Sequence, residues 1–199
     1  MTESEIEFFD RLAPEWDANE IKSTPERVGS ILGKLNIERD MNVLDLGTGT
    51  GVLLPYLSEM VGEQGKVTGI DLSEGMLSIA RDKYGALSNV ELLRLDFEEE
   101  VIPGMYDVVM LYSVYPHLHS PKDTFDWLFR MNIKQGGRIV VAFPSDEKFI
   151  NSIHHDRKAE SDHLPPASRL AAIIREWGYD ARVTASTPDE YIVEVSAPV

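Results

Sequence analysis

The sequence has 199 residues, of which 43% are hydrophobic and 27% charged, and its 34 acidic and 19 basic side chains give a net charge of −15. This composition predicts one folded domain, without the roughly 18 consecutive apolar residues of a membrane span. The acidic excess disfavours nucleic acid and anionic membranes as partners, and the absence of cysteine excludes disulfides and a thiol nucleophile.

The N-terminal region combines two short helices with an aromatic segment. Its first residues lack the basic start and apolar run of a secretory signal, which favours a cytoplasmic location. Residues 4–12 have the pattern of an amphipathic helix, and we expect residues 8–17 to lead from it into a loop. Thr24 is a candidate N-cap for a second helix that begins at Pro25.

A glycine-rich turn follows the first expected strand. Residues 43–46 form the short apolar run of a strand that is buried on both faces, and Gly47, Gly49 and Gly51 then alternate before a helical segment. Glycines let a ligand approach the backbone closely, and a helix N-terminus offers N–H groups. The spacing differs from the Gly-x-Gly-x-x-Gly fingerprint of dinucleotide sites, because Val52 occupies its third position.

The second expected strand ends in an acid, and another acid directly follows the third. Residues 66–71 end in Asp71, which follows Gly51 by the roughly 20 residues that separate a glycine turn from a ribose-binding carboxylate. Ser73 is the expected cap of the helix that comes next. Residues 90–95 form the third expected strand and lead into Asp96 and Phe97.

Residues 106–112 form the fourth expected strand, and a loop with Tyr115, His117 and His119 follows. The remaining elements are expected helices at 121–132, 146–156 and 167–177 and expected strands at 138–141, 181–185 and 191–195. The turn at 187–190 joins the last two strands and predicts a hairpin.

Several of these segments resemble one enzyme family. The Asp-Leu-Gly-Thr-Gly-Thr-Gly run at residues 45–51 resembles the first motif of class I S-adenosylmethionine-dependent methyltransferases. The Phe-Phe-Asp-x-x-Ala-Pro-x-Trp-Asp run at 8–17 is similar to an N-terminal segment of small-molecule methyltransferases, including the quinone-biosynthesis C-methyltransferases, which lies over the cofactor as a lid. Alternatively, its aromatic residues only seal the N-terminal helix against the core. Residues 134–137 resemble the turn into strand five, with Gln135 where proline is common.

The resemblance implies an α/β fold: a Rossmann-like, seven-stranded, mostly parallel sheet with helices on both faces and an antiparallel C-terminal strand. It implies a single methyltransferase domain. Its expected parts are N-terminal helices and lid at 1–36, a cofactor-binding core at 37–145, an insert over the substrate opening at 146–166, and a C-terminal helix and hairpin at 167–199.

The implied cofactor is S-adenosyl-L-methionine. Its ammonium and sulfonium suit a carboxylate in the first strand, whereas a pyrophosphate would be repelled there. In the family the acid after strand two holds the ribose hydroxyls, and the acid after strand three meets the adenine. The cofactor-binding residues implied are Trp16, Asp45, Gly47, Thr48, Gly49, Gly51, Asp71, Leu72, Asp96, Phe97 and Tyr112.

All five histidines lie between positions 117 and 163, after strands four and five. Three interpretations remain open: chance exposure on polar loops, a general base in a substrate pocket, and a metal site. Neither the 117/119 spacing nor the adjacent pair at 154 and 155 matches the His-x-x-x-His spacing of one helical face, so no metal ligands are assigned. The candidate catalytic residues are His117, Tyr115, His154 and His155.

The expected activity is therefore transfer of a methyl group from S-adenosylmethionine to a small molecule by in-line displacement, in a monomer or homodimer. Phe9, Trp16 and Tyr115 are candidates for aromatic faces toward the sulfonium. The alternative is a protein on the same fold that binds the cofactor or a metal without turnover. A nicotinamide dehydrogenase is disfavoured by the glycine spacing and Asp45, and arsenite methylation by the absence of cysteine.

Overall fold

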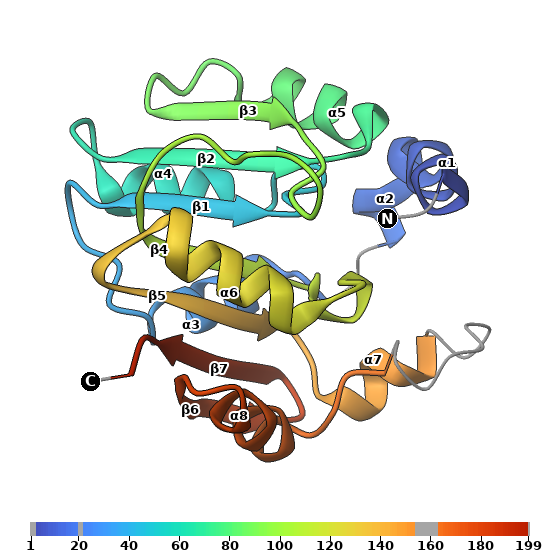
Figure 1. Ribbon diagram of the computed structural model, residues 1–199. Helices are drawn as coiled ribbons and strands as arrows, with labels where there is room; N and C mark the ends of the chain where they lie inside the picture. Colours follow the sequence, from blue (N-terminus) through green and yellow to red (C-terminus); the bar gives the residue numbers. More distant parts are fainter. Residues whose placement is uncertain (1–2, 20–21, 154–162, 199) are drawn as a thin grey trace.

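The computed structural model describes residues 3–19, 22–153 and 163–198, and these form one seven-stranded sheet with helices on both faces (Figure 1). The strand order is β3-β2-β1-β4-β5-β7-β6. The strands are β1 (Asn42–Leu46), β2 (Lys66–Asp71), β3 (Val90–Arg94), β4 (Tyr106–Tyr112), β5 (Ile133–Phe143), β6 (Asp180–Thr187) and β7 (Glu190–Ser196). The pairs among β1 to β5 are parallel, and β7 runs antiparallel to both β5 and β6, which confirms the expected fold class.

Strand β1 lies at the middle of the parallel part. It pairs with β2 through Val43 and Val67, and with β4 through Val43 and Val108. Alternate residues of β1 point to opposite faces, so Val43 joins one buried cluster while Leu44 and Leu46 join the other. Burial on both faces explains why this strand is a continuous apolar run interrupted only by Asp45.

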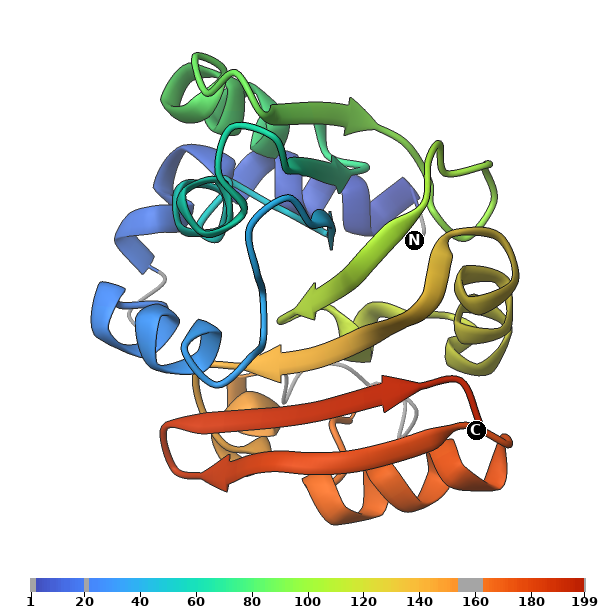
Figure 2. The same cartoon turned by 90° about the vertical axis from the view of Figure 1, so that its left-hand side faces the viewer.

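Helices cover both faces of the sheet (Figure 2). On one face α3 and α4 bury Val28 and Leu57, and on the other α6 and α8 bury Phe125 and Leu170. The helical segments are α1 (Glu3–Leu12), η1 (Ala13–Glu15), α2 (Trp16–Asn19), α3 (Pro25–Leu32), α4 (Leu54–Val61), α5 (Glu74–Tyr84), η2 (Tyr115–His117), α6 (Pro121–Met131), α7 (Glu147–Ile153) and α8 (Ala167–Glu176). None of the described helices is long and apolar enough to cross a membrane.

Capping signals in the sequence fix the starts of two helices. The hydroxyl of Thr24 accepts from the backbone N–H of Arg27 at the start of α3, as expected. The hydroxyl of Ser73 accepts from the N–H of Met76 at the start of α5. These two caps confirm the expected start of each helix.

Four elements differ from the sequence expectation. Residues 134–137, expected as the turn into strand five, already belong to β5, whose pairing with β4 shifts register between Tyr106 and Val108. The chain after α1 stays helical through η1 and α2 instead of forming a loop, because Pro14 occupies the first turn of η1, where its missing N–H costs nothing. Regular helix α4 begins at Leu54, after a turn at residues 51–53. The helix expected at 146–156 is described as α7, and its remaining residues lie outside the described part of the chain.

The strand order places a crevice at the ends of two central strands. From β1 the chain builds outward through β2 to β3, then returns to the other side of β1 as β4 and continues to β5. Loops leaving the carboxyl ends of β1 and β4 therefore diverge, and ligands of open α/β sheets bind at such a point.

Candidate functional site

The glycine turn joins β1 to α4 at the carboxyl edge of the sheet. Gly47, Gly49 and Gly51 all have positive φ angles, of 68°, 56° and 86°. A Cβ at Gly47 would lie 2.5 Å from a methyl of Val114, and one at Gly51 would lie 2.7 Å from Leu54. At Gly49 a Cβ would meet no protein atom within 4 Å. Packing therefore requires the two outer glycines, whereas Gly49 opens toward free space.

That space is a cavity of about 320 Å³ enclosed by several segments. The glycine turn and the ends of β1, β2 and β4 supply one wall, and the N-terminal segment supplies another. The residues that line it include Phe9, Trp16, Asp17, Ser23, Asp45, Thr48, Gly49, Thr50, Asp71, Lys83, Phe97, Tyr112, Ser113 and His117.

Asp71 lies at the end of β2 and is only 7% exposed. Its Oδ2 accepts from the N–H of Gly49 at 2.8 Å, and its Oδ1 accepts from the N–H of Ser73 at 2.9 Å. Burial raises the pKa of this carboxyl, against the opposing effect of these N–H donors. Each oxygen can accept a further hydrogen bond, so the carboxylate can receive two hydroxyl groups from a ligand.

Asp45 is a second buried acid, 2% exposed, within the strand that leads to the turn. The pKa of its carboxyl is raised to about 7, chiefly by burial and also by the charge of Asp71. The hydroxyl of Thr48, which donates to its Oδ2 at 2.7 Å, opposes this rise. Two acids of like charge in one cavity favour a cationic ligand over an anionic one.

The end of β4 forms the third side of the cavity. The hydroxyl groups of Tyr112 and Ser23 lie 3.0 Å apart, which links β4 to the segment before α3. Ser113 has a φ of 60°, a left-handed conformation uncommon for a residue with a side chain. This sharp exit from the strand leads directly into η2, which carries His117.

The N-terminal segment covers the cavity with aromatic side chains. The ring of Phe9 lies edge-to-face against Trp16 at 5.7 Å between centroids and against His117 at 5.5 Å. Both Phe9 and Trp16 line the cavity. The segment thus contacts the loop after β4 directly.

Two acids tie this segment to α5 and to the glycine turn. Oδ1 of Asp10 accepts from the hydroxyl of Ser73 at 2.5 Å and from the N–H of Gly75 at 2.9 Å. Oδ1 of Asp17 accepts from the hydroxyl of Thr50 at 2.6 Å, and its other oxygen pairs with Lys83. Partial burial opposes the ionisation of Asp17, but these two donors hold its pKa below the usual value.

Most of the implied cofactor residues gather around this cavity, and some do not. Gly51, Leu72 and Asp96 are not among its lining residues, and Asp96 borders a second, acidic cavity instead. Tyr115 is 8% exposed and packs edge-to-face on Phe125, with its pKa raised to about 12 by burial. It therefore lies in the core rather than against the cavity.

The described histidines also differ in whether they line the cavity. His117 lines the cavity, whereas His119 is exposed and contacts Glu98. His163 is exposed, and His154 and His155 lie outside the described residues. Within residues 3–19, 22–153 and 163–198, no group of three His, Asp or Glu side chains is placed to hold a metal ion.

Several lining residues were not expected from the sequence. Asp17 belongs to the aromatic motif at 8–17, but only the aromatic residues of that motif suggested a role. Lys83 lies in the last turn of α5, and Ser23 lies in a short connection without any local signal. Their positions depend on contacts between segments that are far apart in the sequence.

Comparison with known proteins identifies the fold and the family. A family model described as a methyltransferase domain matches residues 37–182. The ubiquinone/menaquinone biosynthesis C-methyltransferase UbiE of Salmonella paratyphi B is 29% identical over 160 residues, which cover 77% of this chain. The aligned region spans only 63% of the length of that relative.

Solved structures give the same result. A SAM-dependent methyltransferase from Aquifex aeolicus matches with a TM-score of 0.70 at 25% identity, over 98% of each chain. The complex of DhpI with SAH matches with a TM-score of 0.76 at 21% identity, over 99% of this chain and 97% of that one. The family indicated by the glycine turn is thereby confirmed: this chain belongs to the methyltransferase domain family.

Proposed function

We propose that this protein transfers a methyl group from S-adenosylmethionine to a small-molecule acceptor. The observation that carries the proposal is the open position at Gly49 beside the buried acids Asp45 and Asp71, in a cavity at the divergence of β1 and β4. Family membership and the neighbours whose names include SAM or SAH support it.

The residues present fit this cofactor. An unfilled cradle at Gly49 lets a ligand lie against the backbone, and the carboxylate of Asp71 retains acceptor capacity for a pair of ribose hydroxyls. Asp45 supplies a charge complementary to an ammonium or sulfonium. Phe97 borders the same cavity and offers an apolar face for the adenine.

When bound, S-adenosylmethionine supplies a methyl group already activated by its sulfonium. The chain's own residues then have to align the acceptor and exclude water. Phe9 and Trp16 cover the cavity with apolar rings, which removes water from it and presents aromatic faces to a cation. Tyr112 and Ser23 provide hydroxyl groups on the β4 side.

His117 is the proposed general base of this site. Its ring lies at the cavity wall against Phe9, where an imidazole nitrogen can take the proton that an acceptor O–H or N–H group loses. The small-molecule class of the acceptor is supported by the names of two relatives, UbiE and the DhpI–SAM–HEP complex. The aromatic cover of the cavity suits an uncharged, partly apolar acceptor.

Calorimetry and a transfer assay test the proposal together. S-adenosylhomocysteine should bind the wild type, and Asp71→Ala should lose roughly 10- to 150-fold in affinity, because a charged hydrogen-bond acceptor is removed. Glu63→Gln, at an exposed turn away from the cavity, is the matched control.

The acceptor is sought by incubating the protein and a panel of small phenols, quinols and amines with S-adenosylmethionine labelled in its methyl group. Label recovered in one of these compounds supports methyl transfer. Tight cofactor binding with no labelled product from a broad panel would instead favour a binding protein on the same fold, and absence of cofactor binding would refute the proposal.

A further inference from the structure

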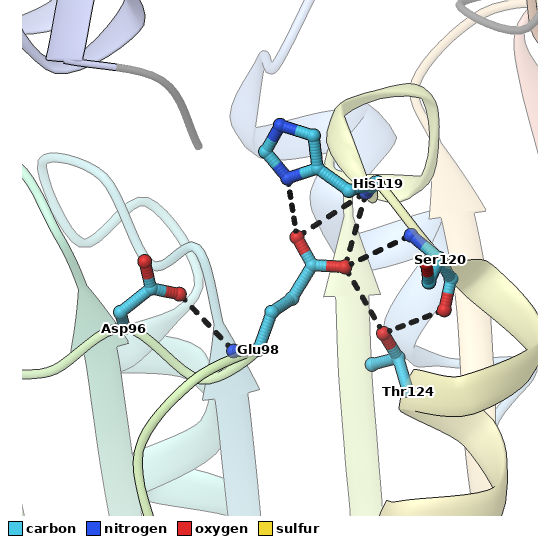
Figure 3. Close-up of polar contacts among 5 residues, drawn as sticks. All are labelled: Asp96, Glu98, His119, Ser120 and Thr124. Carbon is cyan, nitrogen blue, oxygen red and sulfur yellow. Dashed lines mark hydrogen bonds and ion pairs between the residues drawn. The ribbon is translucent and has the colours of Figure 1, made fainter.

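Glu98 connects two walls of the cofactor cavity that are far apart in the sequence. It follows Phe97 in the loop between β3 and β4, and its side chain is only 10% exposed. Its carboxylate reaches the loop after β4, two residues beyond His117 (Figure 3). Both Phe97 and His117 line the cavity, whereas Glu98 does not and borders the second, acidic cavity.

The carboxylate accepts from several donors of this second loop. Oε1 receives the N–H of His119 at 3.0 Å, the N–H of Ser120 at 3.3 Å and the hydroxyl of Thr124 at 3.2 Å. Oε2 lies 3.0 Å from Nδ1 of His119 (Figure 3). Partial burial opposes ionisation of Glu98, but these donors outweigh it and keep its pKa below the usual value.

Hydrogen bonds within the loop between β3 and β4 also hold the backbone of Glu98. Its N–H donates to Oδ1 of Asp96 at 3.1 Å (Figure 3). The N–H of Asp96 in turn donates to Oε1 of Glu100 at 2.9 Å. Hydrogen bonds within the loop that carries Phe97 therefore hold the backbone on both sides of this residue in place. Phe97 directly precedes Glu98 in this loop, and the carboxylate of Glu98 accepts from the backbone N–H groups of residues 119 and 120.

A simpler role is also present in these contacts. Ser120 is the N-cap residue of α6, but its own side chain makes no capping bond, and Glu98 satisfies the N–H of Ser120 from another segment. A carboxylate at a helix N-terminus is also favoured by the helix dipole. Capping alone would stabilise α6 without any consequence for the cavity, so a test has to separate the two roles.

We propose that Glu98 is a positioning residue that couples the Phe97 wall of the cofactor cavity to His117, so that binding of the cofactor fixes the loop that faces the acceptor. This inference rests on the proposed function. It predicts that cofactor binding lowers backbone opening in residues 114–120, where the N–H of His117 donates to Val114 at 2.8 Å, and that this response depends on Glu98.

The experiment measures hydrogen exchange of residues 114–120 with and without S-adenosylhomocysteine. We expect cofactor-dependent protection in the wild type and in Glu99→Ala, which removes the adjacent exposed carboxylate. Glu98→Ala should lose that protection, and its affinity for S-adenosylhomocysteine should fall roughly 3- to 10-fold, since contacting residues are energetically coupled. Glu98→Gln keeps one acceptor oxygen and should retain part of both effects.

The double variant Glu98→Ala/Ser120→Asp separates positioning from capping. An aspartate at position 120 can cap α6 locally and should restore the melting temperature, but it restores no link to the Phe97 loop, so cofactor-dependent protection should stay absent. Protection that returns in the double variant, or that persists in Glu98→Ala, overturns the inference. A wild type that binds S-adenosylhomocysteine without gaining protection at 114–120 also overturns it, whereas a wild type that binds none refutes the proposed function and the inference with it.

Discussion

The backbone N–H of Gly49 donates to Oδ2 of Asp71 at 2.8 Å, across a sequence separation of 22 residues. The glycine turn and the acid after β2 are thus held against each other by the protein itself. A ligand that uses both finds them already in place, which lowers the ordering cost of binding. Changes to this pre-formed site and to the segments around it therefore have specific expected effects.

Gly49→Val should abolish binding of S-adenosylhomocysteine, because the side chain would occupy the space in which the cofactor meets the backbone. The φ of 56° also strains any residue with a side chain, at a cost of about 1–3 kcal/mol in stability. Gly136→Val is the matched control, since Gly136 has a φ of 80° and equally open surroundings outside the cavity. Calorimetry should show lost binding only at position 49; normal binding by Gly49→Val would reduce the turn to a structural role.

Asp45 should make cofactor affinity depend on pH. With a pKa of about 7, its carboxyl holds a proton in mildly acidic solution, and a cationic ligand favours the ionised form. Affinity for S-adenosylmethionine should therefore rise between about pH 6 and pH 8, with release of a proton. Calorimetry in two buffers of different ionisation enthalpy measures that proton, and Asp45→Asn should not release it. An unchanged proton release in Asp45→Asn would assign the titration to another group.

The same acid should affect folding stability in the opposite direction. Its pKa is raised from 3.8 to about 7 by burial, so between these values the folded state binds more protons than the unfolded one. Stability from this group is therefore lost as pH rises through that window, and Asp71, whose pKa is also raised, acts in the same direction. Urea unfolding from about pH 5 to pH 8 should show the decline in the wild type and a shallower one in Asp45→Asn.

The segment at residues 8–17 should behave as a lid. Hydrogen exchange of this segment should slow when S-adenosylhomocysteine binds, because closure buries Phe9 and Trp16 over the cavity. Asp17→Ala removes the contacts to Thr50 and Lys83 and should speed cofactor dissociation, whereas Glu15→Gln, an exposed neighbour, should not. Equal protection with and without the cofactor would identify a fixed structural element.

The role of the histidines can be decided with an acceptor found by the labelling panel. If His117 is a base, the rate should rise with pH as its imidazole loses a proton, and chelators should have no effect. If His117 contributes to a metal site, chelators should remove activity. His117→Ala should lose roughly 100-fold or more in rate as a base. A His154→Ala/His155→Ala variant tests the pair outside the described residues, and full activity in both variants would leave these histidines as polar surface.

Local pattern in the sequence was sufficient for the fold and for the positions of the glycine turn and of the acid at the end of β2. The apolar runs, the alternate glycines and the offset to Asp71 depend on residues close together along the chain, as do the caps at Thr24 and Ser73. Strand order then follows from the few topologies that such alternation allows. This is why β1, β2, β4 and the hairpin of β6 and β7 lie where the sequence predicts.

Contacts between distant segments decided where the loop side chains around the cavity lie. The sequence by itself determined a methyltransferase-like sheet with an acid at the end of β2, but it did not place Tyr115 in the core against Phe125, or His117 against Phe9. Nor did it indicate that Asp17 would reach Thr50, or that Glu98 would bind the start of α6. Each of these arrangements depends on how loops pack after the sheet has formed, and no periodicity or spacing along the chain encodes the direction in which a loop side chain points.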